Sequence, residues 1–275
     1  SCRCDDASGL WPCEALPAAP PAAGAPAAGS TRHAKTGDRL LDAVAPSLAL
    51  VGVTMPYSVP GVTERNYYGT GVVIDAARGL VAVDRNTVPV SLGDVRVTFA
   101  GTLEVPGRVE YVHPLHNLAV VSYDPAAIGD TPVRAARFAA GALAPGEEVT
   151  VVGLNRDHRL LSQRARVASV DPVAFPLSRT LQFRESNLST VRLVSGPGDF
   201  DGVIVDGRGA ALALWSSFAF ENGRQMQQEN QGIPADIVVE MLGHVRDGSP
   251  VHSLEAEFAE RPLAEARRLG LEETW

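Results

Sequence analysis

The side chains from which a shifted catalytic triad for acyl transfer could be proposed lie in two segments of this sequence. His113 and His116 precede Asn117, and Ser195 precedes Gly196. A serine hydroxyl becomes a nucleophile when a base lies beside it, and histidine is the usual base. Because such triads are defined by geometry, these residues allow a serine hydrolase only if the fold brings them together.

Other kinds of site have less support. No glycine-rich phosphate loop, acid and base carboxylate pair or metal-ligand cluster emerges from the sequence, so we expect no cofactor and no metal. Cys2, Cys4 and Cys13 lie in the first fifteen residues, and their spacing is not that of a zinc site. We interpret them as free thiols in a mobile tail.

Composition narrows the class of protein. The chain has 275 residues, of which 45% are hydrophobic, and a net charge of -8. This excludes a disordered chain, and it argues against a nucleic-acid partner because phosphate binding requires a concentrated basic face. The apolar stretch Ala43 to Val53 is interrupted by Pro46 and is too short to span a membrane.

The chain then divides into a leader and a core-forming region. Leu16 to Ser30 is almost entirely Ala, Pro and Gly, so we expect residues 1–39 to be a disordered leader or linker. From about residue 40, short runs rich in Val and Leu alternate with turn residues, which predicts strands. The runs are Ser47–Thr54, Gly69–Asp75, Gly79–Asp84, Val95–Ala100, Arg108–Val112, Leu118–Tyr123, Glu148–Leu154, Leu160–Val170, Thr190–Val194, Gly202–Val205 and Ala210–Phe218.

This spacing predicts an all-β sandwich or barrel. One helix follows the strands. Pro234 suits its first turn, and the sequence ends it near Gly248. Its apolar stripe should cover a barrel end, and it consists of Ile237, Val238, Met241, Leu242 and Val245.

Three segments in this order resemble the trypsin-like domain of the HtrA (Deg) serine proteases. They are Gly69 to Val88, His113 to Val121 and Ser195 to Trp215. The likeness covers residues 45 to 247 and is greatest to the degenerate second protease-like unit of the large Nma111-type and Deg7-type proteins, which also have PDZ-like units. The resemblance implies a two-lobed trypsin-like (chymotrypsin-type) double β-barrel with a C-terminal helix.

The same resemblance implies that the catalytic triad is absent. The histidine position falls on Asn86, the aspartate position on Asn117, and the serine position on Gly198 or, with one residue deleted, on Asp201. An amide cannot accept and return a proton near neutral pH, and neither glycine nor a carboxylate provides a hydroxyl nucleophile. We therefore expect no catalytic residue here.

The oxyanion loop also departs from the family pattern. Pro197 removes a backbone N–H, and Asp199 adds negative charge where two amides should hold an oxyanion. The alternative is a rewired triad of Ser195 with His113 or His116. Against it, both histidines belong to the turn where the barrel places the acid, and Ser195 should end a strand.

The last residues predict a separate unit. A strand at Val251 to Phe258 and a helix after Pro262 resemble the start of a PDZ-like domain, so we expect domains at 40–248 and 249–275. Leu254, Phe258, Leu263 and Leu269 are the side chains that could dock this tail on the barrel.

The resemblance also sets expectations about role. It favours an assembly or scaffolding role within a larger PDZ-containing serine endopeptidase, as a homo-oligomer based on trimers. A peptide-binding module that uses the old substrate cleft is the alternative. The lack of a signal segment favours an intracellular compartment, and the resemblance suggests nucleus or plastid.

Overall fold

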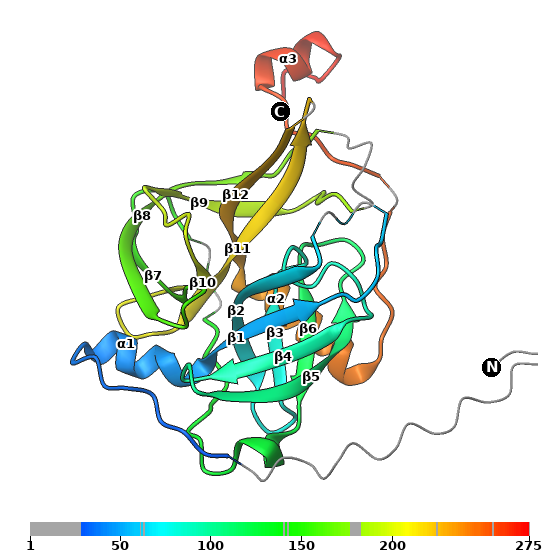
Figure 1. Cartoon of the computed structure of the whole chain (residues 1–275). Coiled ribbons are helices and arrows are strands. Elements are labelled where there is room, and N and C mark those ends of the chain that lie inside the picture. The colour runs from blue at the N-terminus through cyan, green and yellow to red at the C-terminus, as the bar shows by residue number, and fades with distance from the viewer. Residues whose placement is uncertain are drawn as a thin grey trace, which may run out of the picture.

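Two closed barrels of six strands lie side by side in the computed structural model (Figure 1). The structure describes residues 29 to 274 except 61, 63, 140, 142, 177–182, 224 and 255. The leader cysteines lie outside the described residues. The fold is the trypsin-like double barrel that the sequence predicted.

The first barrel has the strand order β1-β2-β3-β6-β5-β4, with every pair antiparallel. Its strands are β1 (Leu48–Thr54), β2 (Asn66–Asp75), β3 (Leu80–Val83), β4 (Asp94–Phe99), β5 (Leu103–Val112) and β6 (Ala119–Tyr123).

The second barrel has the order β10-β11-β12-β9-β8-β7. Its strands are β7 (Glu148–Leu154), β8 (Leu160–Pro172), β9 (Ser189–Val194), β10 (Asp201–Val205), β11 (Ala211–Asn222) and β12 (Gln225–Pro234). Trp215 is only 3% exposed inside this barrel. Its indole Nε1 donates to Pro197 O at 3.0 Å, so it anchors the core of this barrel.

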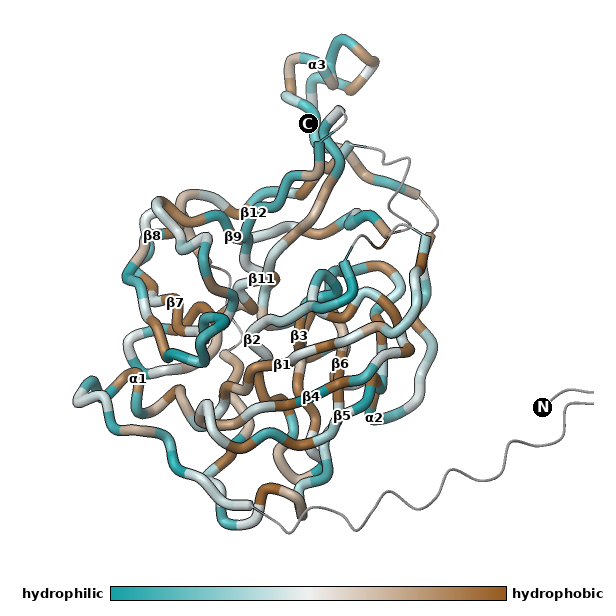
Figure 2. The backbone as a smooth tube through the Cα atoms, viewed as in Figure 1, coloured by the Kyte–Doolittle hydropathy of each residue, from teal (hydrophilic) through white to brown (hydrophobic). Residues whose placement is uncertain are grey.

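The central strands bury both of their faces. Val73 points into the first barrel, whereas its neighbours Val72 and Ile74 point to the contact between the barrels. In the second barrel, Ile204 points into the barrel and Val203 points to the contact between the barrels. Successive side chains of a strand alternate between its faces, so a strand with two buried faces becomes a continuous apolar run. Figure 2 shows these hydrophobic stretches along β3 to β6.

Helix α2 (Ala235–Asp247) covers the contact between the barrels. Val238 and Met241 are fully buried in the apolar cluster that both barrels share. Arg246 Nη2 donates to Asp75 Oδ2 at 2.6 Å, which ties the helix to the first barrel. The chain ends the helix at Gly248, whose φ of 65° is the left-handed conformation that glycine adopts at little cost. The predicted helix is confirmed.

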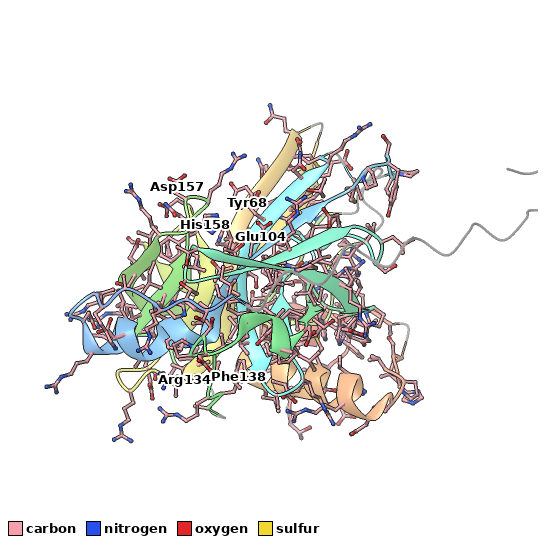
Figure 3. The ribbon with its side chains drawn as sticks, turned by 60° about the horizontal axis from the view of Figure 1, so that its bottom comes forward. Tyr68, Glu104, Arg134, Phe138, Asp157 and His158 are labelled. Carbon is pink, nitrogen blue, oxygen red and sulfur yellow. The ribbon has the colours of Figure 1, made fainter. Side chains whose placement is uncertain are left out.

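The connection from the first barrel to the second also runs along this contact. The short helix η2 (Pro125–Ile128) follows β6. Beyond it, Ala136 N donates to Val73 O at 2.8 Å, and Phe138 forms a parallel bridge with Ala211. Figure 3 shows Arg134 and Phe138 on the underside of the molecule. The two barrels are therefore held by backbone pairing as well as by apolar packing.

Some elements differ from the prediction. β12 was not predicted because its first residues are polar and exposed, and ten register pairs with β11 hold it. Helix α1 (Arg39–Val44), capped by Asp38, and the turn η1 (Ala45–Ser47) also precede β1.

The prediction of a strand at Val251 to Phe258 is wrong, because the described residues of that segment form no strand. The short helix α3 (Leu263–Arg268) does follow Pro262. Leu254, Phe258, Leu263 and Leu269 are between 49% and 82% exposed, so these side chains do not dock the tail on the barrel. Whether residues 249–275 begin another domain stays a prediction. No helix among the described residues is long and apolar enough to cross a membrane.

Candidate functional site

A turn at the end of β3 begins the site. Asp84 is 3% exposed, and its Oδ1 accepts from Thr87 N at 2.7 Å. Val88 N donates to Asp84 O at 3.1 Å, so the chain turns sharply between them. An aspartate that bonds its own backbone a few residues on is a common way to fix such a turn. This turn carries Asn86 into the space between the barrels.

Ser217 of β11 joins the two predicted triad positions of the first barrel. Asn86 Nδ2 donates to Ser217 Oγ at 2.8 Å, and Asn117 Nδ2 donates to Ser217 O at 2.8 Å. Ser217 N in turn donates to Asp84 Oδ2 at 3.0 Å, and Ser217 Oγ lies 3.3 Å from the same oxygen. The structure thus brings Asn86 and Asn117 together, and the amide of each donates to Ser217.

The Oδ1 and the backbone N of Asn117 bond residues other than Ser217. Its Oδ1 accepts from Arg85 N at 3.0 Å, and its N donates to Glu185 Oε2 at 2.6 Å. The other oxygen of the buried Glu185 lies 2.8 Å from His116 Nδ1. The side-chain amide and the backbone N–H of Asn117 therefore have protein partners, which hold this side chain in one orientation.

The second barrel contributes the other two predicted positions. Asp201 begins β10, and its Oδ1 accepts from Asn230 Nδ2 at 2.9 Å. β2 passes so close that a Cβ on Gly69 would lie 2.2 Å from Thr87 Oγ1 and 3.2 Å from Asp201 Oδ2. Gly198 is exposed, and a Cβ there would meet no atom within 4 Å. Asp201 therefore belongs to the packed site, whereas Gly198 lies on its open edge.

Burial changes the charges of these groups. Desolvation raises the pKa of Asp84, and desolvation with the nearby charge of Asp84 raises the pKa of Asp201 well above its usual value. On the other side of the site, burial lowers the pKa of His113 to about 4, with the charges of His116, His244 and Arg85 acting in the same direction. Burial favours the protonated, neutral form of a carboxyl and the neutral form of an imidazole, because neither form places an unpaired charge in the interior.

Two cavities open at this site. One of about 540 Å³ is lined by Asn86, Gly198, Asp201 and Ser217 among others. The other, of about 190 Å³, lies beside Asn86 and Asn117 and has aromatic walls. The rings that line it are Tyr67, Phe175, Phe183, Phe218 and Phe220. An apolar group could be held in the smaller cavity, with the polar groups of the larger one beside it.

The residues of the rewired triad lie in different barrels. Ser195 follows β9 with a φ of 55°, and its carbonyl accepts from Gln163 Nε2. His113 precedes β6, is 4% exposed, and its Nδ1 accepts from Leu115 N and His116 N at 3.2 and 3.0 Å. His113 is therefore committed to its own turn.

Three residues of the site had not been predicted from the sequence. Asp84 could have been noticed, since it ends a buried strand two residues before Asn86. Ser217 lies in an apolar run, and nothing local marks Glu185 as buried. In the described part of the chain, no group of three or more His, Cys, Asp or Glu side chains is placed to hold a metal ion.

Comparison with known proteins gives relatives that are several times longer. The PDZ domain-containing protein C23G3.12c of Schizosaccharomyces pombe is 31% identical over 223 residues, which are 79% of this chain and 22% of that protein. The pro-apoptotic serine protease NMA111 of Pyricularia oryzae is 28% identical over 284 residues, 98% of this chain and 27% of that protein. The chain spans about a quarter of the length of these relatives.

Solved structures share the fold. The Rv3671c protease of Mycobacterium tuberculosis, in an inactive form, has a TM-score of 0.53 and 19% identity and covers 76% of this chain and 93% of its own. An inactive-form mutant of the same protease gives a TM-score of 0.53 with 20% identity, over 78% of this chain and 93% of its own. No family model matches the sequence.

Proposed function

We propose that this chain, an HtrA-like member of the serine proteases with a trypsin-like double barrel, is a proteolytically inactive unit of a larger PDZ-containing serine endopeptidase. Its role is assembly or scaffolding. The larger protein, not this chain, would cleave peptide bonds.

The contact between Asn86 and Ser217 is the observation that supports inactivity most directly. The resemblance puts the base position at Asn86, whose amide nitrogen donates to Ser217 Oγ at 2.8 Å. A general base must accept a proton from the nucleophile and return it, which an amide cannot do near neutral pH. Ser217, whose Oγ accepts this bond, is 2% exposed. The same Oγ donates to Asp84 Oδ2 at 3.3 Å.

A covalent probe tests this proposal. The purified chain is incubated with a fluorophosphonate and, separately, with casein, with trypsin as the active control. We expect no labelling and no cleavage. Labelling that Ser195→Ala abolishes would establish the rewired triad, and labelling that Ser217→Ala abolishes would place a nucleophile in the site. Either result would overturn inactivity.

A peptide-binding role is the second candidate, and the aromatic cavity of about 190 Å³ favours it. A cavity with apolar walls and polar groups at one side is typical of a site for an apolar side chain. Extended peptides with one aromatic side chain should bind, and Phe220→Ala should weaken them. Val194→Ala is the matched control, because Val194 is 55% exposed and does not line the cavity.

Light scattering separates the two roles. Assembly predicts a homo-oligomer, based on trimers as the resemblance implies, and a monomer that binds extended peptides would favour the second candidate.

The resemblance also favours an intracellular protein of the nucleus or a plastid. Imaging of a fluorescent fusion of the whole protein tests that location.

A further inference from the structure

The segment just before β9 holds a stretch of the C-terminal tail by the side chain of Glu257. Arg184 Nη1 and Nη2 donate to Glu257 Oε1 and Oε2 at 2.8 and 2.7 Å. Arg184 Nη1 also donates to Phe175 O at 3.0 Å, which orients the guanidinium. Two parallel bonds from one planar fork are specific for a carboxylate in one orientation.

Asn187 binds the backbone on both sides of that glutamate. Asn187 Nδ2 donates to Ala256 O at 2.6 Å, and Phe258 N donates to Asn187 Oδ1 at 2.8 Å. A side-chain amide that bonds a C=O and an N–H two residues apart does what a neighbouring strand would do. It therefore selects an extended segment, whatever the side chains on either side.

Apolar packing adds little to this contact. Phe258, which lies in the held segment, is 65% exposed. Leu254, which precedes this segment, is 82% exposed. The tail is thus bound here through a carboxylate and two backbone groups. These are the features by which a site recognises a class of peptide and not a single folded partner.

We propose that Arg184 and Asn187 form a binding site for an extended peptide segment with a central glutamate, and that its ligand in this chain is Ala256-Glu257-Phe258. This site goes beyond the proposed function, since it does not depend on whether the triad positions are catalytic. A peptide of the same chemistry would compete with the tail.

The site is attached to the wall of the candidate functional site. The Arg85 guanidinium carbon lies 3.7 Å from the centre of the Phe183 ring, and Glu185 accepts from Asn117 N at 2.6 Å. Arg184 and Glu185 both line the aromatic cavity. A ligand on Arg184 and Asn187 would therefore contact a residue that also lines this cavity.

A peptide titration on the full-length chain tests the site. Glu257→Ala frees Arg184, and a fluorescein-labelled peptide of residues 253 to 261 is titrated by anisotropy. We expect the peptide to bind the Glu257→Ala chain at least about tenfold more tightly than the unsubstituted chain, where the tail competes. The same peptide with Gln at the central Glu should lose about tenfold.

Two double variants make the test specific. Arg184→Ala with Glu257→Ala should abolish binding, whereas Arg192→Ala with Glu257→Ala is the matched control and should bind normally, since Arg192 pairs with Glu229 of β12. Equal binding to both double variants would overturn the proposal. So would a peptide that does not distinguish the unsubstituted chain from Glu257→Ala.

Hydrogen exchange examines the contact within the chain. The amide of Phe258, which donates to Asn187 Oδ1, should exchange faster in Arg184→Glu and in Glu257→Arg, and the reversed pair Arg184→Glu with Glu257→Arg should restore its protection. The hydrogen bond with Arg184 lowers the pKa of Glu257, so protection should be full above the ordinary pKa of a glutamate and be lost as pH falls through the lowered one. Fast exchange in the unsubstituted chain at neutral pH would contradict the site.

Discussion

On the first-barrel side of the candidate site, Asn117 is 4% exposed and has a protein partner for each polar group that it presents. On the second-barrel side, Gly198 is exposed and would have no atom within 4 Å of an added Cβ. The resemblance to the HtrA serine proteases puts the aspartate position at Asn117 and the serine position at Gly198 or Asp201, which stays a prediction. Asn117 is held by several buried hydrogen bonds, whereas a side chain added at Gly198 would meet no other atom, so substitutions at the two positions should have very unequal costs.

The largest difference is expected in stability. Asn117→Leu removes the partner of Arg85 N and of Ser217 O, and two orphaned buried groups cost about 2–4 kcal/mol together. Gly198→Ala should change the free energy of unfolding by less than about 0.5 kcal/mol. Urea unfolding of both variants measures this. Similar losses in the two variants would show that the second side is as tightly held as the first.

The first side should also respond to acid through His113. Its pKa of about 4 lies below the unfolded value of about 6.5, so the unfolded state binds the proton first as pH falls. The lowered pKa of His113 therefore favours the folded state above pH 6.5. This contribution to the free energy of unfolding is lost between about pH 6.5 and 4, by up to about 3 kcal/mol.

His113→Asn checks that response. The amide oxygen can still accept from Leu115 N and His116 N, but it does not titrate. Unfolding free energies at pH 7 and pH 4.5 should therefore differ less in the variant than in the unsubstituted chain. An unchanged difference would mean that other groups cause the acid response.

The second side should respond in the opposite direction through Asp201. Burial and the charge of Asp84 raise its pKa in the folded state, so the folded state binds the proton more tightly. The associated stability is present at low pH and is lost as pH rises through the raised pKa. Asp201→Asn, which can still accept from Asn230, should be more stable than the unsubstituted chain at pH 8 and no more stable at pH 4. Thermal unfolding at the two pH values measures this.

The smallest effect is expected from rebuilding the triad. Asn86→His, Asn117→Asp and Gly198→Ser in one chain should still leave a fluorophosphonate unreacted. The reason lies on the second side, where Pro197 has no N–H to donate and its carbonyl accepts from Trp215 Nε1 at 3.0 Å. Labelling of the triple variant, absent from the unsubstituted chain, would show that the open side keeps a working oxyanion site.

The sequence by itself determined the barrels and the helix that covers them, because strands with two buried faces appear as apolar runs and the helix has one apolar stripe. The resemblance to a known family put the triad positions at Asn86, Asn117 and Gly198 or Asp201, and their loss of catalytic function stays a prediction. The sequence could not predict β12, whose polar residues are strand only because β11 pairs with them. It predicted a strand at Val251 to Phe258, where the described residues form no strand. Only the tertiary structure decided that Ser217 and Glu185 join the two amides, since these contacts span 68 to 131 residues of sequence. Contacts between residues so far apart depend on how two barrels pack, and no local pattern records them.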